Sequence, residues 1–120
     1  MKIAIPMDEK GLDSPVCASF GRAPYFLIYS TATNEEEYLD NAAVASQGGA
    51  GVRAAQVIVD RGVKALLTPR CGENAEKVLR AGEVLVYRSK EGSARANIEA
   101  FAAESLPLLT AFHAGLHGHN

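Results

Sequence analysis

Two cysteines are the first residues of this 120-residue chain that suggest a chemical function. Cys71 follows Pro69 and Arg70 and precedes a predicted helix, a setting that favours the thiolate through the helix start and the neighbouring guanidinium. A thiolate is a nucleophile or a soft metal ligand, so Cys71 is a candidate metal ligand, with an inert thiol as the alternative. Cys17 is a second candidate ligand, and its alternative is a small buried hydrophobic residue. The two cysteines form no C-x-x-C pair, so we predict neither a zinc ribbon nor a disulfide framework.

Three histidines near the end of the chain have spacings that suit metal binding. His113 and His117 would share one face of a helix, and His117 and His119 could chelate a metal in an extended segment. Gly115 and Gly118 disfavour the helix. The histidines are therefore candidate ligands of a metal such as copper, and a disordered tail with adventitious affinity for copper or nickel is the alternative.

A glycine-rich stretch matches a nucleotide-binding pattern in part. Gly49 to Ala54 read G-x-G-x-x-A, the dinucleotide fingerprint, but no buried apolar strand precedes them. Thr68-Pro69-Arg70 also replaces the acidic residue expected at the end of the next strand. The alternative is a glycine-rich turn into a helix whose N–H groups bind an anion.

The composition excludes several classes of protein. Hydrophobic residues make up 48% of the chain and the net charge is −2, which argues for a globular protein and against a basic nucleic-acid binder. No apolar stretch approaches the ~20 residues of a membrane span, and no signal peptide is recognisable. We therefore expect a cytoplasmic protein that binds neither nucleic acid nor membrane.

The elements that position these residues follow from apolar runs, periodicity and glycine stops. Helices and strands alternate in the second half, which requires right-handed parallel crossovers and predicts an α/β fold, β-β-β-α-β-α-β-α. The first, fourth and fifth strands are expected to be parallel, and the second and third to pair antiparallel on one side of a mixed five-stranded sheet. We predict strands at 2–6, 25–29, 37–41, 63–68 and 84–87, helices at 52–61, 73–81 and 93–105, a single domain at 1–106, and a loose tail at 107–120.

This topology places the three helix starts, residues 48–51, 69–74 and 90–95, at one edge of the sheet. Ligands of open α/β sheets bind at that edge, and helix starts attract anions. Arg22, Arg53, Arg70 and Arg95 lie in or near the segments concerned, so we predict a local anion site, with solvated surface arginines as the alternative. The candidate cofactor-binding residues are Arg22, Gly48, Gly49, Gly51, Arg53, Arg70, Gly72 and Asn74.

Four ordered motifs together carry a family resemblance: residues 1–6, 20–29, 48–51 and 71–75. The chain resembles the dinitrogenase iron–molybdenum cofactor biosynthesis family over roughly residues 1–105. The resemblance implies a ribonuclease-H-like three-layer fold without nuclease activity. It also implies non-covalent binding of a molybdenum-containing metal–sulfur cluster, of the molybdenum–copper sulfide or iron–molybdenum type. Ser19 stands where many members have a histidine, and the glycine stretch lacks another, so charge, N–H donors and shape are expected to hold the cluster.

These observations combine into one functional hypothesis with three alternatives. We expect a non-catalytic carrier of an anionic metal–sulfur cluster, which exchanges its cluster with donor or acceptor proteins. A thiol-dependent enzyme that uses Cys71, a small nucleotide-binding protein that uses residues 49–54, and a protein-interaction module with an empty site are the alternatives.

Overall fold

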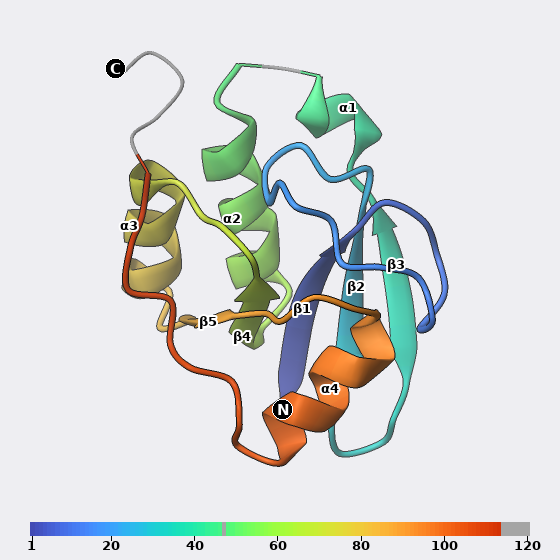
Figure 1. Cartoon of the computed structure of the whole chain (residues 1–120). Coiled ribbons are helices and arrows are strands. Elements are labelled where there is room, and N and C mark those ends of the chain that lie inside the picture. The colour runs from blue at the N-terminus through green and yellow to red at the C-terminus, as the bar shows by residue number, and fades with distance from the viewer. Residues whose placement is uncertain (47, 114–120) are drawn as a thin grey trace.

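The computed structural model describes residues 1–46 and 48–113 (Figure 1). None of its helices is long and apolar enough to cross a membrane, within the part of the chain described. The elements in chain order are β1 (Lys2–Met7), β2 (Tyr25–Ser30), β3 (Glu36–Asp40), α1 (Ala42–Ala45), α2 (Ala50–Asp60), β4 (Val63–Thr68), α3 (Glu73–Ala81), β5 (Leu85–Arg88) and α4 (Ala94–Ala102).

The five strands form a mixed sheet in the order β3-β2-β1-β4-β5. β1 pairs parallel with β4, and β4 parallel with β5, whereas β2 runs antiparallel to both β1 and β3. The predicted strand directions and the mixed five-stranded sheet are confirmed. The short helix α1 was not predicted, since its four residues are too few to show a helical period.

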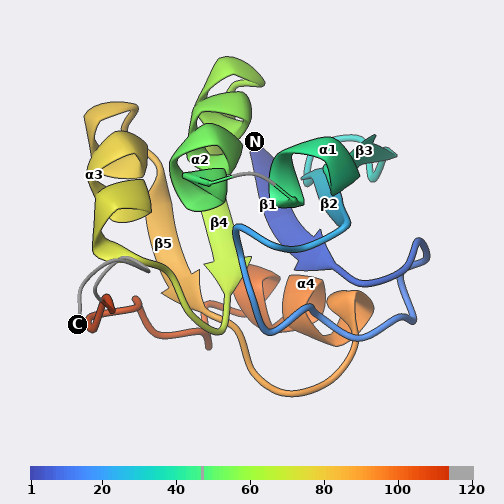
Figure 2. The same ribbon diagram turned by 90° about the horizontal axis from the view of Figure 1, so that it is seen from above.

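Helices cover both faces of the sheet. Seen from above, α1, α2 and α3 lie on one side of the strands and α4 on the other (Figure 2). Each face has its own core, because side chains alternate along a strand: Ala4 of β1 belongs to the α2/α3 side, and Ile3 and Ile5 belong to the α4 side. Burial on both faces explains why the central strands have continuous apolar sequences. The ribonuclease-H-like label itself remains a prediction.

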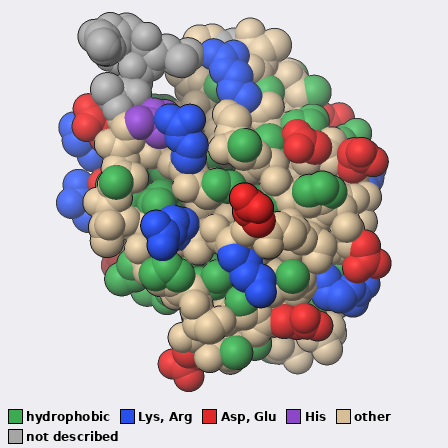
Figure 3. Space-filling view, viewed as in Figure 1, with side chains coloured by type: hydrophobic (Ala, Val, Ile, Leu, Met, Phe, Trp, Pro, Cys, Tyr) green, Lys and Arg blue, Asp and Glu red, His purple; other side chains and the backbone are tan. Residues whose placement is uncertain are grey.

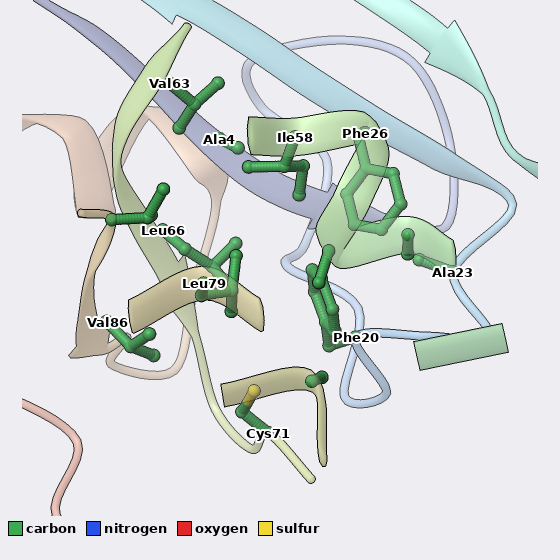
Figure 4. Close-up of a cluster of buried hydrophobic side chains, with 14 of the residues drawn as sticks. Ala4, Phe20, Ala23, Phe26, Ile58, Val63, Leu66, Cys71, Leu79 and Val86 are labelled. Carbon is green, nitrogen blue, oxygen red and sulfur yellow. The ribbon is translucent and has the colours of Figure 1, made fainter. Parts of the chain in front are cut away.

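The core on the α2/α3 side is the one that supports the site. Phe26 of β2, Ile58 of α2, Leu66 of β4 and Leu79 of α3 meet in it (Figure 4). Phe26, Ile58 and Leu79 are at most 1% exposed. Close packing of this kind fixes where α2 and α3 begin relative to the sheet.

The last helix is shorter than its predicted span of 93–105. Ser93 caps its start, as predicted, by accepting a hydrogen bond from the N–H of Ala96 at 3.1 Å. Its end is a Schellman motif: Glu104 has a positive φ of 57°, and the N–H of Ser105 donates to Ala100 O at 2.9 Å. The helix therefore ends at Ala102, three residues before the predicted end at Ser105.

Residues 107–113, which we call the C-terminal strap, do not form the predicted loose tail. Leu109 N–H donates to Val86 O at 2.9 Å, and Arg88 N–H donates to Pro107 O at 2.8 Å, so the strap pairs with β5. Leu109 and Phe112 also pack against the core on the α2/α3 side. These hydrogen bonds and apolar contacts fix a segment whose sequence has no regular period. Residues 114–120 of the predicted tail lie outside the described residues.

Candidate functional site

A cavity of about 410 Å³ lies where the loop before β2 meets the starts of α2 and α3. These segments come together at the end of the molecule where β1 and β4 terminate (Figure 1). Eight of the residues predicted for cluster or metal binding line this cavity: Arg22, Gly49, Gly51, Arg70, Gly72, Asn74, Cys71 and His113. Two of the three predicted helix starts, those of α2 and α3, thus meet at one cavity.

The third helix start lies elsewhere. α4 packs on the opposite face of the sheet, and Arg95 in its first turn forms an ion pair with Asp13, with Nε and Oδ1 2.8 Å apart. Parallel topology set the edge of the sheet at which α4 begins, but not the face that it covers. The prediction that all three helix starts gather at one site is therefore wrong for α4.

Three of the predicted site residues do not line the cavity. Arg53 is exposed on α2, and Gly48 is exposed before it. Cys17 is 7% exposed and belongs to the hydrophobic core, and its Sγ lies 3.4 Å from Ser19 O as a hydrogen-bond donor. Burial raises the pKa of the Cys17 thiol. Its position matches the alternative interpretation, a small buried hydrophobic residue.

The loop before β2 is fixed by contacts that the sequence analysis did not foresee. Phe20 is buried against Phe26, with ring centroids 5.2 Å apart. The next residue, Gly21, lies directly against the first turn of α2, where a Cβ on Gly21 would approach Gly51 Cα to 2.7 Å. Ala18, Ser19, Phe20, Gly21, Ala50, Val52 and Ala75 are lining residues absent from the predicted set. The motif Phe20-Gly21-Arg22 was noted in the sequence, but only Arg22 was predicted as a binding residue, because only Arg22 carries a charge.

Backbone N–H groups face the cavity from two helix starts. The first N–H groups of an α-helix have no acceptor within the helix, and neither α2 nor α3 has a side-chain cap. Gly49 begins α2 with a φ of 72°, a left-handed conformation that glycine adopts without cost. In α3 the N–H of Glu73 is already used, because it donates to His113 O at 2.8 Å. The donors that remain for a ligand belong to Ala50, Gly51, Asn74 and their neighbours.

The lining is positively charged. Arg22 and Arg70 contribute two guanidinium groups, and no Asp or Glu is among the described residues that line the cavity. Arg22 Nη1 donates to Ala45 O at 2.8 Å, which holds this side chain across the loop that leads to α2. In the space-filling view, the purple histidine has a blue Lys or Arg side chain directly beside it (Figure 3). A chain of net charge −2 therefore carries a local site suited to an anion.

The surroundings of Cys71 disfavour the thiolate that the sequence predicted. The residue is 1% exposed and packs in the core on the α2/α3 side (Figure 4). Burial is the main cause that raises the pKa of its thiol, to about 12, with a smaller contribution from the charge of Glu76. The helix start and Arg70 do not offset this desolvation. Cys71 Sγ lies 3.5 Å from Gly72 O, a backbone acceptor.

The partial nucleotide motif has the wrong structural context. A dinucleotide fingerprint follows a buried strand, whereas α1 comes before Gly49 and the strand before α1 is the outer strand β3. Gly49 to Ala54 therefore match the alternative interpretation, a turn that leads into a helix.

Metal ligands are sparse around the cavity. No group of three His, Cys, Asp or Glu that could hold a metal ion occurs within residues 1–46 and 48–113. His113 lines the cavity, and His117 and His119 lie outside the described residues. The site thus contains more groups that bind an anion, namely arginines and backbone N–H groups, than side chains that ligate a metal.

Comparison with known proteins agrees with the family resemblance. Residues 1–104 match the family model described as dinitrogenase iron-molybdenum cofactor. The apo form of the orange protein from Desulfovibrio gigas is 34% identical, with a TM-score of 0.87 over 92% of this chain and 93% of that one. A candidate NifB protein from Thermotoga is 38% identical, with a TM-score of 0.81 over 92% and 95% of the two chains. A candidate dinitrogenase from Methanocaldococcus jannaschii, 22% identical with a TM-score of 0.71 over 92% and 95%, shares the fold. The search of curated proteins gave no match.

Proposed function

The chain belongs to the dinitrogenase iron-molybdenum cofactor family, and on this premise we propose that it binds and carries an anionic molybdenum-containing metal–sulfur cluster. The cluster is cargo, taken up and released intact, and the protein makes or breaks no bond in it. The proposal includes clusters of the molybdenum–copper sulfide and iron–molybdenum types.

One observation carries the proposal: the cavity combines two arginines with two helix starts that lack side-chain caps, and it contains no carboxylate among its described lining residues. Sulfide-bridged molybdenum clusters are negatively charged and present sulfur atoms as hydrogen-bond acceptors. Guanidinium and backbone N–H groups are donors that match such a surface without a covalent bond.

The shape of the cavity also suits a compact inorganic cluster. About 410 Å³ lies within the range of small-ligand sites. Much of the wall is glycine and alanine, which lets a rigid cluster approach the backbone closely. The wall residues of this kind are Ala18, Gly21, Gly49, Ala50, Gly51, Gly72 and Ala75.

A carrier fits the site better than a thiol-dependent enzyme does. A nucleophilic cysteine needs a low pKa and access to substrate, and Cys71 has a thiol pKa of about 12 and 1% exposure. Metal ligation by Cys71 or His113 stays a prediction that the proposal does not require. Exchange of the cluster with donor and acceptor proteins is part of the proposal.

The test is anaerobic reconstitution. The protein is incubated with tetrathiomolybdate alone, or with tetrathiomolybdate plus copper or iron, and then desalted. We expect a charge-transfer absorption that stays with the protein fraction, with molybdenum present by metal analysis. Complete loss of molybdenum on desalting under all three conditions would contradict the proposal.

A further inference from the structure

The C-terminal strap extends beyond the part of the chain that the family model covers. The model matches residues 1–104, and the strap comprises residues 107–113. It leaves the end of α4, runs along β5 and reaches the start of α3 (Figure 1). The strap therefore lies outside the segment that the family model matches.

The inner end of the strap is bonded to the wall of the cavity. His113 N–H donates to Cys71 O at 3.3 Å, and His113 O accepts from the N–H of Glu73 at 2.8 Å. These two bonds form a parallel bridge across Gly72, which lines the cavity between them. A displacement of the strap would therefore break backbone hydrogen bonds of the cavity wall itself.

The His113 side chain faces the cavity over Gly72. A Cβ on Gly72 would come within 3.4 Å of His113 Cε1, so the absence of a side chain at this position leaves room for the imidazole. His113 is exposed and is one of the lining residues. The ring lies at the same cavity as the guanidinium groups of Arg22 and Arg70.

We propose that the strap is a wall of the cargo site, in which the His113 imidazole donates an N–H hydrogen bond to a sulfur of the bound cluster. This inference rests on the proposed function. The imidazole acts as a donor, because three metal-ligating side chains do not come together within the described ranges and a single imidazole makes a weak metal site. An imidazole offers an N–H in both of its charge states.

The inference has a thermodynamic consequence. A ligand that contacts both the strap and the body of the domain stabilises the docked strap, and the docked strap strengthens ligand binding by the same factor. An apolar residue that holds the strap against the core should then affect binding of the cluster without contacting it. Phe112 packs against the core, whereas Leu108 in the same segment is 52% exposed.

The first experiment measures binding of tetrathiomolybdate alone, without copper, to the full chain under anaerobic conditions. We expect His113→Ala to weaken binding about fivefold, the effect of one lost hydrogen bond. We expect Phe112→Ala to weaken binding as well, with Leu108→Ala as the matched control that leaves it unchanged. Equal affinities of the wild type, His113→Ala and Phe112→Ala for tetrathiomolybdate would overturn the inference. In that case the proposed function would still stand, because the wild type would still bind tetrathiomolybdate.

The second experiment needs no variant. Amide hydrogen exchange of the wild type reports on the N–H groups of Leu109 and Glu73, which the strap bonds. We expect slow exchange in the apo protein and slower exchange with tetrathiomolybdate. Exchange at free-chain rates in the apo protein would overturn the inference, and this result would have no bearing on the proposed function.

Discussion

Gly21 and Gly51 lie in backbone contact: a Cβ placed on Gly21 would be 2.7 Å from both the Cα and the N of Gly51. This contact joins the loop before β2 to the first turn of α2. Both residues line the cavity, so the distance between these two walls depends on the absence of a side chain at residue 21.

Gly21→Ala should therefore damage both the fold and the site. The added methyl group meets backbone atoms that cannot rotate away, and overpacking of this kind costs about 1–3 kcal/mol. Gly48→Ala is the matched control, because no atom of the described residues beyond its chain neighbours lies within 4 Å of a Cβ at Gly48. Urea unfolding should show a lower midpoint for Gly21→Ala and an almost unchanged one for Gly48→Ala. Cluster retention after desalting should follow the same order.

The arginines of the cavity should contribute to cargo affinity, and an arginine outside it should not. Arg22→Gln and Arg70→Gln each remove a charged donor, so each should weaken binding of tetrathiomolybdate about tenfold or more. Arg53→Gln removes the same charge from the exposed side of the same region and should leave affinity unchanged. The measurement is anaerobic titration followed by absorbance. A loss with Arg53→Gln as large as with Arg70→Gln would mean that overall charge, and not the cavity, attracts the anion.

Cys71 should be unreactive in the native protein. Its thiol pKa of about 12 leaves little thiolate at pH 8, and the side chain is 1% exposed. Iodoacetamide should modify Cys71 roughly a hundredfold or more slowly in the native state than in urea, with mass spectrometry to locate the label. Rapid native labelling at Cys71 would contradict the assignment of a buried, protonated thiol.

The same thiol gives the apo protein a stability that decreases at high pH. The unfolded state loses the Cys71 proton near pH 9, whereas the folded state keeps it until about pH 12. Between these values the folded state binds more protons, so the free energy of unfolding falls by up to about 1.4 kcal/mol per pH unit. Urea unfolding at pH 8 and pH 10 should show a larger decrease for the wild type than for Cys71→Ala, which lacks the group. Equal decreases in the two proteins would show that this thiol is not linked to folding.

Cys71 should also be dispensable for cargo binding. If guanidinium and N–H groups hold the cluster, Cys71→Ser should retain most of it after desalting, because a serine of similar size preserves the wall. The check is the molybdenum content per protein chain, with circular dichroism to confirm that the variant is folded. A variant that folds but retains no molybdenum would instead identify Cys71 as a ligand.

The strands and their directions were predictable because each depends on local patterns and one topological rule. Val63 to Thr68 form an apolar run, interrupted by the exposed Lys64, between two helical segments, which indicates a parallel central strand. The edge at which helices begin follows from that parallel arrangement, and at this edge Arg70 and Gly72 line the cavity.

The remaining features depend on contacts between residues distant in sequence. Desolvation of Cys71 comes from the assembled core, and it outweighs the helix start and Arg70 that local reading favoured. Arg95 had the same local signal as Arg70, but its helix packs on the other face of the sheet and its charge is paired with Asp13. The strap has no periodicity, and its position is fixed by backbone bonds to β5 and to the start of α3.

Pairing of the strap with β5 also bears on self-association. A sheet with two bare outer strands can recruit further strands and aggregate. Here Leu109 and Pro107 bond to β5, so part of that border is already occupied by the chain itself. The opposite border, β3, carries the exposed carboxylates of Glu36 and Asp40, which repel the same strand of a second molecule. Edge-to-edge pairing with a second molecule is thus disfavoured at both borders, at one by partial occupancy and at the other by like charge.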